Sequence, residues 1–320
     1  MNGFRKPAKH DPVPDFALSK QAILDIEKLA EASYGQGHVA DYIPPLREII
    51  PHQFGLAIAH CNGETQACGL ADVRFSIQSI SKLFALTLAL RLAAPDIWKR
   101  VKRDPCMGRF NSVSDVETNA GVPSNPFVNA GAIVVSDAIV SRSSAPNRIV
   151  LDFMRKLSGQ GDIHSNENVA SGESEVGNRN FALAYLLKDY GNIHNKVDDV
   201  LSFYFNSCAI EMSCKELARA ALFLANDGQA PGTGYQVVSP EEARELNALL
   251  TTCGMYAGSG EFAFRIGIPA KSGVGGGILA IVPQRMAICV WSPELDTNGN
   301  SIVGQSILSY LVQKMGISIF

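Results

Sequence analysis

Residues 75–86 read Phe-Ser-Ile-Gln-Ser-Ile-Ser-Lys-Leu-Phe-Ala-Leu and place a Ser-x-x-Lys pair, Ser79 and Lys82, at the start of a long apolar segment. Residues three apart lie on one face of a helix, so the lysine amine can reach the serine hydroxyl. Serine becomes a nucleophile when a neighbouring base takes its proton, and a lysine buried among apolar side chains has a lowered pKa and can be that base. In the first helical turn, free backbone N–H groups would favour negative charge developing at Ser79.

The Ser79–Lys82 pair alone does not decide the function. A chain with this many serines and lysines contains about one Ser-x-x-Lys match by chance, and this sequence contains a single one. The simpler interpretation is an ordinary helix N-terminus at which serine is the cap. A catalytic interpretation therefore depends on the motifs that accompany the pair.

The composition is that of a globular protein and argues against one class of partner. The 320 residues can bury a sizeable core, as one large domain or as two lobes, and 46% of them are hydrophobic and 18% charged. The net charge is −3 and the pI is near 6.1. Because no basic surface follows from these values, we expect no nucleic-acid partner.

The distribution of apolar residues argues against a membrane protein. The most apolar segments are interrupted by Arg91, Asp137 and Arg285, so we expect no transmembrane helix and no membrane partner. Residues 1–20 are polar, contain several prolines and lack the apolar core of a signal peptide. We therefore expect a loose N-terminal leader over residues 1–20 and a cytoplasmic protein.

Cysteines and histidines form no recognisable disulfide or metal pattern. The seven cysteines are scattered without a Cys-x-x-Cys pair, and a disulfide scaffold is not expected in a cytoplasmic chain of this size. The six histidines lack metal-ligand spacing, so we expect no metal. A Cys–His nucleophile stays open as an alternative, although no cysteine lies in an activating context.

The first third of the chain predicts a helix, a strand pair and a buried helix. The predicted elements are an amphipathic helix, a proline-containing loop and two strands, over residues 22–34, 37–46, 54–60 and 64–70. Asn62-Gly63 supplies the tight turn between the strands. Residues 80–94 are apolar on nearly every side and predict a buried helix, so Ser79 would emerge where a sheet meets a helix.

The middle of the chain predicts mainly helices. They are expected over residues 148–157, 179–187, 198–206, 213–227 and 240–250, with Gly228 as the C-cap of the fourth. A turn at Asn125-Pro126 leads into another helix with Asn129 in its first turn, where Asn129 is either a cap or a side chain directed into a cleft. Residues 98–122 are predicted to be irregular, and the polar stretch 161–178, with Glu173 and Glu175, is predicted to be a surface loop.

Strand patterns return near the C-terminus. Three antiparallel strands are expected over residues 262–267, 270–282 and 286–291, with a turn at Pro283-Gln284, before a closing helix over 301–315. Strands at both ends and helices in the middle predict an α+β fold. We expect a single catalytic domain over residues 21–320, in which a helical lobe (79–257) is inserted into a sheet lobe (21–78 plus 258–320).

Lys271-Ser272-Gly273, on a predicted strand, is the second motif. A Lys-[Ser/Thr]-Gly strand together with a Ser-x-x-Lys helix is the pattern of penicillin-binding proteins and serine β-lactamases. The glycines at 273 and 275–277 fit a strand whose backbone approaches a ligand closely, although a bulge or tight turn would explain them equally well. A backbone N–H from this strand and that of Ser79 would form an oxyanion hole. The two motifs together favour an acyl-transfer serine enzyme.

Further strings of residues make the resemblance more specific. The chain resembles the serine-dependent glutaminase family from about residue 20 to residue 320. The matching strings are Gln-Ser-Ile-Ser-Lys (78–82), Asn-Pro-Phe-Val-Asn-Ala-Gly-Ala-Ile (125–133), Met-Tyr (255–256), Ala-Lys-Ser-Gly-Val-Gly-Gly-Gly-Ile (270–278), Ala-Asp-Tyr-Ile-Pro (40–44) and Trp-Ser-Pro-Glu-Leu-Asp (291–296).

The resemblance implies a fold and an activity. The fold would be β-lactamase/transpeptidase-like, an antiparallel sheet flanked by helices with an inserted all-helical lobe. The activity would be hydrolysis of the side-chain amide of L-glutamine to L-glutamate and ammonia, without metal or organic cofactor. The family also implies a homo-oligomer, usually a tetramer, with a dimer as the alternative.

The resemblance also implies roles for individual residues. Ser79 would attack the side-chain amide carbon to form a γ-glutamyl ester, while Lys82 and Tyr256 would share the proton transfers, with the primary base left open. The backbone amides of Ser79 and Val274 would form the oxyanion hole. The α-carboxylate would be bound by Tyr42, Asn129, Asn180 and Tyr204. Tyr204 is, by helix position alone, equally well explained as a core residue.

Two glutamates fit the position of the α-ammonium ligand in the family pattern. The family pattern places the serine of a Ser-Glu pair eight positions, and its glutamate seven positions, before the asparagine that corresponds to Asn180. Here Glu173 has the expected spacing but follows Gly172, whereas Ser174-Glu175 reproduces the dipeptide two residues later. Spacing favours Glu173, and Glu175 stays the alternative.

Two other classes of protein would share part of this pattern. A β-lactamase or peptidase would have both motifs but would normally be exported, and no export signal is visible. A non-enzymatic glutamine sensor or scaffold would have no use for the nucleophile and base formed by Ser79, Lys82 and Tyr256. Ammonia release from glutamine distinguishes the three.

Overall fold

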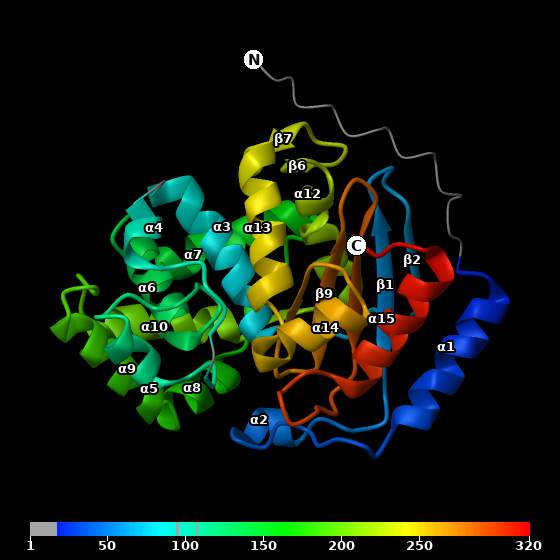
Figure 1. Cartoon of the computed structure of the whole chain (residues 1–320), viewed down its shortest axis with the longest axis horizontal. Helices are drawn as coiled ribbons and strands as arrows, with labels where there is room; N and C mark the ends of the chain where they lie inside the picture. Colours follow the sequence, from blue (N-terminus) through cyan, green and yellow to red (C-terminus); the bar gives the residue numbers. More distant parts are fainter. Residues whose placement is uncertain (1–17, 94–95, 107) are drawn as a thin grey trace.

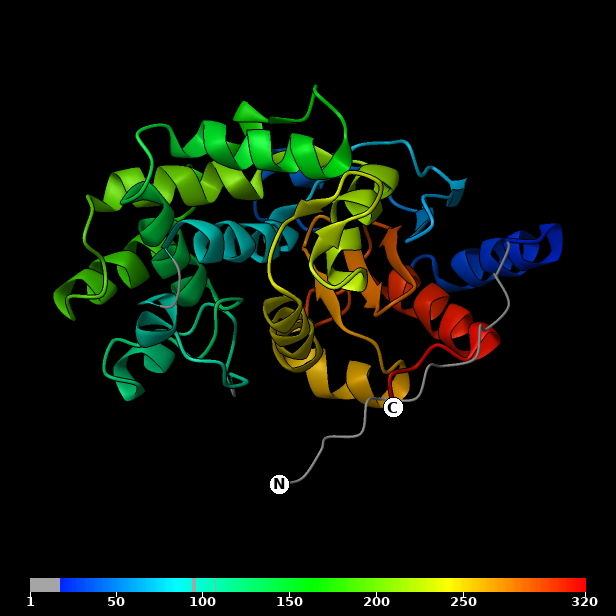
Figure 2. The ribbon, with the colours of Figure 1, turned by 90° about the horizontal axis from the view of Figure 1, so that it is seen from above.

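The computed structural model of the protein describes residues 18–93, 96–106 and 108–320. The leader expected over residues 1–20 lies almost entirely outside these ranges, and so does Ala94 at the end of the predicted buried helix. The described residues form a five-stranded sheet with helices packed on both faces, and most of the helices gather on one side of it (Figures 1 and 2). The predicted α+β fold with an antiparallel sheet is confirmed.

The central sheet joins the two ends of the chain. Its strands pair antiparallel in the order β2-β1-β10-β9-β8 and are β1 (Gly55–His60), β2 (Thr65–Gly69), β8 (Ala270–Ser272), β9 (Gly277–Val282) and β10 (Met286–Trp291). The predicted turn between β1 and β2 is confirmed, since the Glu64 N–H donates to the Asn62 side chain at 2.9 Å and Gly63 has φ +97°.

Alternate residues of the strands face two separate hydrophobic cores. On one face, Leu56 and Ile58 pack with α1 (Lys20–Ser33) and α15 (Ile302–Met315), which lie side by side (Figures 1 and 2). On the other face, neighbouring residues of β1 belong to a larger core that includes α11 (Cys214–Ala220) and α12 (Leu222–Ala225). This alternation is expected of a strand covered on both faces.

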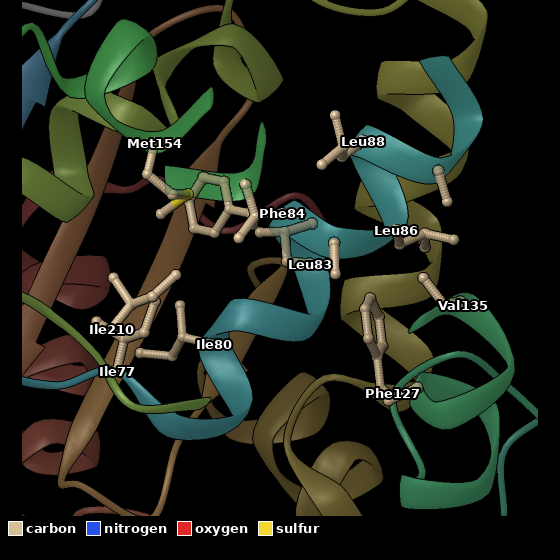
Figure 3. Packing of buried hydrophobic residues seen from close by; sticks show 14 of the residues in the cluster. Ile77, Ile80, Leu83, Phe84, Leu86, Leu88, Phe127, Val135, Met154 and Ile210 are labelled. Atoms are coloured by element: carbon tan, nitrogen blue, oxygen red, sulfur yellow. The ribbon is translucent and has the colours of Figure 1, made fainter. Parts of the chain in front are cut away.

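The helix that follows Ser79, α3 (Ser81–Ala93), is the centre of the helical part. Its main neighbours are α6 (Asn129–Val140), α7 (Pro146–Ser158) and α10 (Val197–Cys208). Figure 3 shows Phe84 beside Met154 on one side of α3 and Leu86 directed toward Val135 on another. The prediction of a helix that is buried on nearly every side is confirmed, and burial on all sides keeps the start of α3 in a fixed position.

The remaining elements are short or peripheral. They are α2 (Pro44–Arg47), α4 (Ile97–Arg100), α5 (Val113–Thr118), α8 (Glu167–Glu175), α9 (Asn178–Asp189), α13 (Pro240–Cys253), α14 (Ser259–Arg265), β3 (Phe75–Ser76), β4 (His164–Ser165), β5 (Ile210–Met212), β6 (Gln229–Ala230) and β7 (Tyr235–Gln236). The helices predicted over residues 22–34, 148–157, 179–187, 198–206, 240–250 and 301–315 are confirmed within a few residues as α1, α7, α9, α10, α13 and α15.

The predicted surface loop over residues 161–178 is wrong. This stretch contains β4 and α8, and Figure 1 shows α8 beneath α10. The side chain of Asn166 accepts hydrogen bonds from the N–H groups of Asn168 and Val169 and so caps α8. The small and polar residues of α8 conceal its buried face in the sequence, since Gly172 and Glu173 are on that face with Val169.

The predicted strands near the C-terminus need two corrections. Residues 262–267 are not a strand, because α14 spans Ser259–Arg265. The apolar residues at 262, 264 and 266 imitate a strand, but Phe262 and Ile266, four residues apart, share the buried face of the helix while Phe264 is 87% exposed. Residues 270–282 are a hairpin rather than one strand, since Gly276, with φ +95°, belongs to a turn between β8 and β9.

Three further stretches differ from the prediction. The proline loop over 37–46 ends in the helix α2, in which Pro44 and Pro45 occupy the first positions, where the missing N–H is harmless. The stretch 98–122 contains the short helices α4 and α5. The helix predicted over 213–227 is divided at Ala221 into α11 and α12. The prediction of Gly228 as its C-cap is wrong, because α12 ends at Ala225 with Asn226 as the cap, and Gly228, with φ +80°, lies in the turn that follows.

The division into two lobes stays a proposal. Helices α11 and α12 belong to the stretch 79–257, yet they pack directly against the sheet strands β1 and β10. The helices nearest to α3, by contrast, pack mainly on one another. We therefore propose that the sheet lobe (21–78 plus 258–320) and the helical lobe (79–257) form a single domain, because the larger of the two cores contains residues of both lobes.

Candidate active site

Ser79 lies at the N-terminal end of α3, beside strands β8 and β9. After β3 the chain forms the 3-10 turn Gln78–Ile80 and continues directly as α3. Ser79 is therefore in the turn before the α-helix, whereas the sequence predicted the first turn of the helix. Its side chain is half-buried and hydrogen-bonded to the hydroxyl of Tyr256.

Lys82 is buried in the first turn of α3 and has no carboxylate partner within salt-bridge distance among the described residues. Its Nζ donates to the backbone oxygen of Phe127 at 3.2 Å and to Oδ1 of Asn129 at 2.7 Å. Burial lowers the pKa of Lys82 to about 8, and the groups at Cys208 and Glu173 only partly oppose this shift. About a tenth of Lys82 is therefore neutral at pH 7, and about half at pH 8.

Asn129 and Asn180 extend this chain of hydrogen bonds. Asn129 is the first residue of α6, as predicted, and its Nδ2 donates to Oδ1 of Asn180 on α9 at 2.9 Å. The amide of Asn129 is oriented by its contact with Lys82, because its oxygen accepts from the amine and its nitrogen is left to donate. Asn180 is the last residue in this series of hydrogen bonds, and its side chain, which carries Nδ2, is half-buried.

Glu173 is a buried carboxylate next to these groups. It is 7% exposed, and the hydroxyl of Tyr42 donates to its Oε1 at 2.6 Å. Burial raises the pKa of Glu173, while hydrogen bonds with Tyr42 and Gln78 and the charge of Lys82 act in the opposite direction. Glu175 is exposed on the other side of α8. The structure therefore brings Glu173, and not Glu175, to the candidate site.

Tyr204 lies on α10, behind Lys82. The Lys82 Nζ is 5.8 Å from the centroid of the Tyr204 ring, and the Tyr204 hydroxyl is hydrogen-bonded to the thiol of Cys208. Burial raises the pKa of Tyr204 well above its ordinary value. Because Tyr204 is buried and has a hydrogen-bond partner, it fits the core as well as the ligand site.

Tyr256 follows α13 and begins a 3-10 turn, Tyr256–Gly258. Its hydroxyl lies 3.4 Å from the backbone oxygen of Ser272 and is hydrogen-bonded to Ser79. Burial raises the pKa of Tyr256, and the hydrogen bond with Ser79 partly opposes this shift. The phenol is therefore protonated near neutral pH and is able to donate a proton.

Lys271 lies beneath the Tyr256 ring. It is 0% exposed, donates to the backbone oxygens of Ser272 (2.6 Å) and Gly254 (3.0 Å), and its Nζ is 4.5 Å from the centroid of the Tyr256 ring. Burial and the charge of Lys82 lower the pKa of Lys271 well below its usual range. The lysine of the Lys-Ser-Gly motif thus packs against the Tyr256 ring and holds the neighbouring backbone at Gly254 and Ser272.

The turn after β8 touches the turn that contains Ser79. A Cβ atom added to Gly273 would lie 2.5 Å from the backbone oxygen of Ile77 and 3.3 Å from the nitrogen of Ser79. Only glycine fits this close approach. Val274, the predicted second oxyanion-hole residue, follows directly in this turn and is half-buried.

A cavity of about 170 Å³ lies beside Tyr256. It is lined by the loop before α5, by the start of α6 and by the turn around Tyr256, and Phe110 from that loop packs on the Tyr256 ring with centroids 5.0 Å apart. The cavity is large enough for several water molecules. Water therefore has room next to the Tyr256 ring.

Comparison of the sequence with known proteins shows to which family the chain belongs. The sequence model described as Glutaminase matches residues 37–320, most of the chain. The chain belongs to the glutaminase family. A glutaminase of Proteus mirabilis (strain HI4320) is 50% identical over 304 residues, which are 95% of this chain and 99% of that protein. The resemblance read from the motifs is thereby confirmed.

Solved structures of glutaminases have the same fold. The crystal structure of a probable glutaminase of Bacillus subtilis has a TM-score of 0.86 and 32% identity, covering 94% of this chain and 98% of that one. A second structure, of a probable glutaminase from Bacillus subtilis complexed with 6-diazo-5-oxo-L-norleucine, has a TM-score of 0.84 and 31% identity and covers 100% of both chains. The β-lactamase-like fold expected of a glutaminase is confirmed.

Sequence reasoning on this glutaminase missed one residue of the site. Gln78 is buried immediately before Ser79, has φ +48°, and presents its Oε1 3.1 Å from the hydroxyl of Tyr42. Its side chain also donates to Ser76 at 3.0 Å. A glutamine directly before the candidate nucleophile was the available signal.

The described residues of the glutaminase contain no group of three or more histidine, cysteine or acidic side chains that could hold a metal ion. Over the same residues, no helix is long and apolar enough to cross a membrane.

Proposed function

We propose that this chain hydrolyses the side-chain amide of L-glutamine to L-glutamate and ammonia through a γ-glutamyl ester on Ser79. The observation that carries the proposal is the buried amine of Lys82, whose two hydrogen bonds go to the carbonyl oxygens of Phe127 and Asn129. A neutral amine has two hydrogens and one lone pair. With both hydrogens donated, the lone pair is left for the hydroxyl on the same helical face, that of Ser79.

The first half of the reaction forms the ester. Lys82, with a pKa of about 8, accepts the proton of Ser79 as the serine oxygen bonds to the amide carbon. Backbone N–H groups of Ser79 and Val274 stabilise the oxyanion of the tetrahedral intermediate. The C–N bond then breaks, and the leaving nitrogen takes the proton of the Tyr256 hydroxyl, which the Lys82 ammonium restores. Ammonia leaves.

The second half releases glutamate. A water molecule gives a proton to Lys82, by way of Tyr256, as its oxygen bonds to the ester carbon. When the ester C–O bond breaks, the oxygen of Ser79 regains a proton and the free enzyme is restored. The cavity next to the Tyr256 ring provides room for water beside the phenol, and Ser79 and Lys82 do not line it.

Recognition of a free amino acid is supported by the buried charge of Glu173. No Lys or Arg nitrogen lies within salt-bridge distance of its carboxylate among the described residues, so a cation in the site would meet an uncompensated anion. We assign this position to the α-ammonium group of the substrate. The α-carboxylate is assigned to neutral donors, namely Tyr42, Asn129, Asn180 and Tyr204. The single hydroxyl hydrogen of Tyr42 would then be shared between this carboxylate and Glu173. Hydrogen bonds to charged groups contribute about 1.5–3 kcal/mol each.

A relative supports the same class of ligand. A probable glutaminase from Bacillus subtilis is complexed with 6-diazo-5-oxo-L-norleucine. That molecule is an α-amino acid whose fifth carbon is a carbonyl, at the position of the amide carbon of glutamine. An α-amino acid with a carbonyl at that distance is the substrate that we assign to this chain.

We also propose that the protein is a cytoplasmic homo-oligomer, a tetramer or a dimer. The support for this is the family resemblance rather than a contact between copies. Light scattering of the purified protein tests the oligomeric state directly. A monomer at micromolar concentration would contradict it.

The activity is tested by measuring ammonia release from L-glutamine, with L-asparagine and a chromogenic cephalosporin in parallel. We expect ammonia from glutamine and no cephalosporin hydrolysis. Ser79→Ala should abolish turnover and leave glutamine binding within a few-fold of the wild type. Cephalosporin hydrolysis alone would indicate a β-lactamase, and glutamine binding without turnover would indicate a sensor.

A further inference from the structure

Tyr256 has an unusual backbone conformation for a residue of its kind. Its φ is +54°, in the left-handed region, which is costly for a side chain other than glycine by about 1 kcal/mol or more. Such a conformation persists only where neighbouring groups enforce it. The hydroxyl of this residue is hydrogen-bonded to Ser79, so whatever enforces the conformation also sets the position of the hydroxyl.

Two buried side chains hold the backbone around Tyr256, and one of them, Asn300, bonds to the peptide that precedes this residue. The hydroxyl of Ser259 accepts from the Met255 N–H (3.0 Å) and donates to the Tyr256 oxygen (2.9 Å). The Nδ2 of Asn300 donates to the Met255 oxygen at 3.2 Å. Ser259 is local to the turn. Asn300 comes from the loop before α15 and therefore fixes the turn relative to the sheet and its covering helices.

The position of Asn300 is itself fixed by its loop. Oδ1 of Asp296 accepts from the backbone N–H groups of Asn298 (2.8 Å) and Asn300 (3.0 Å), and Oδ2 accepts from Nε2 of Gln305 at 3.0 Å. Asn300 is 1% exposed, whereas Asn298 is exposed. The hydrogen bonds of Asp296 thus hold the loop in the conformation in which the amide of Asn300 reaches Met255.

Stability alone does not account for an amide at position 300. Oδ1 of Asn300 is buried and accepts no hydrogen bond among the described residues. An unsatisfied buried acceptor costs about 1–3 kcal/mol. A leucine of similar shape would avoid this cost but could not donate to Met255. The hydrogen bond to the peptide before Tyr256 is therefore what distinguishes asparagine from an apolar residue here.

We propose that Asn300 is a positioning residue that holds the Tyr256 hydroxyl in place for proton transfer to and from Ser79. The inference rests on the proposed function, because it assigns Tyr256 to the proton transfers. Asn300 acts through the backbone and touches no substrate. Its loss should therefore lower kcat and leave KM nearly unchanged, since a displacement of about 1 Å at a reacting group can cost roughly 100-fold in rate.

The test compares Asn300→Leu with Asn298→Leu, the same change at an exposed position of the same loop. We expect kcat for glutamine to fall about 10- to 100-fold in Asn300→Leu, with KM within about threefold and a melting temperature close to that of the wild type. Asn298→Leu should retain the wild-type kcat. A wild-type kcat in Asn300→Leu would overturn the proposal, as would a raised KM with unchanged kcat.

A double-mutant cycle separates positioning from general support of the fold. In a Tyr256→Phe background the hydroxyl is absent, so Asn300→Leu should cause little further loss of the residual rate. An equal loss in both backgrounds would show that Asn300 acts on something other than the hydroxyl. An active wild type with an unaffected Asn300→Leu would overturn only this inference, whereas a wild type that releases no ammonia from glutamine would overturn the proposed function.

Gly258→Ala perturbs the same contact from the opposite side, should Asn300→Leu fail to fold. The added Cβ would lie 3.2 Å from Nδ2 of Asn300, so the amide must shift by a few tenths of an ångström, and the backbone of Gly258, with φ −84°, accepts alanine. We expect a smaller fall in kcat with unchanged KM. An unchanged kcat would contradict the proposal.

Discussion

Replacing Glu173 by glutamine tests how the protein recognises a free amino acid. The change keeps the shape and an acceptor for the Tyr42 hydroxyl but removes the buried negative charge. In the unliganded protein that charge has no lysine or arginine within salt-bridge distance among the described residues, and it accepts a 2.6 Å hydrogen bond from Tyr42. The substrate ammonium would be its only close cationic partner.

The expected magnitude follows from the contacts that are lost. One hydrogen bond between charged groups contributes about 1.5–3 kcal/mol, and about 1.4 kcal/mol corresponds to tenfold in binding. Glu173→Gln should therefore raise KM for glutamine by about 10- to 150-fold. The lower part of this range is the better expectation, because the carboxylate must share its oxygens between the ammonium and Tyr42. The kcat should change less than KM.

The assay is ammonia release over a range of glutamine concentrations, with Glu175→Gln as the matched control. Glu175 is exposed on the other side of α8, so its replacement should leave KM unchanged. Burial raises the pKa of Glu173, which means that the folded state disfavours its charge. Glu173→Gln should therefore keep or raise the melting temperature. An unchanged KM, or a larger effect of Glu175→Gln, would refute the reasoning.

Two further predictions concern the base and the stability of the helical part. Lys82 must be neutral to accept a proton, and its pKa is lowered to about 8. The value of kcat/KM should therefore rise with pH up to about 8 and then level off. A profile that is flat between pH 6 and 9 would contradict this. Arg100→Met should destabilise the protein by about 3–5 kcal/mol in denaturant unfolding, because Asp137 is fully buried and its Oδ2 lies 2.6 Å from the Arg100 guanidinium. A loss below 1 kcal/mol would show that Asn195 and the backbone suffice to stabilise Asp137.

Local patterns predicted the elements that carry the nucleophile. The segment after Ser79 is long and mostly apolar, and its length and its apolar character on nearly every side predict the buried helix α3. The hairpin of β1 and β2 is equally clear, since Asn62-Gly63 has few other structural interpretations. Both elements depend only on residues close together in the chain, and α3 carries Lys82 directly after the turn that contains Ser79.

The errors arose where one pattern has two structural interpretations. Phe262, Phe264 and Ile266 alternate as in a strand, but the first and last also lie one helical turn apart, and burial of that pair decides for a helix. In α8 the buried face contains glycine, alanine and a glutamate, which carry almost no hydrophobic signal. Packing against α10, rather than local propensity, forms this helix.

Contacts between distant parts of the chain were beyond spacing arguments. The hydrogen bond between Tyr42 and Glu173 joins residues 131 positions apart, and the bond from Asn300 to Met255 spans 45. The family resemblance indicated the first pair through its motifs. Nothing in the sequence indicated the second, because a buried asparagine that holds a backbone oxygen leaves no pattern.

The central claim is that Ser79 carries the γ-glutamyl group during turnover. Rapid-quench mass spectrometry of the protein with L-glutamine, followed by digestion, tests this directly. We expect a transient γ-glutamyl group on the peptide that contains Ser79, and its absence in Ser79→Ala. Steady ammonia release with no modified peptide at any quench time, or with the group on another residue, would contradict the mechanism.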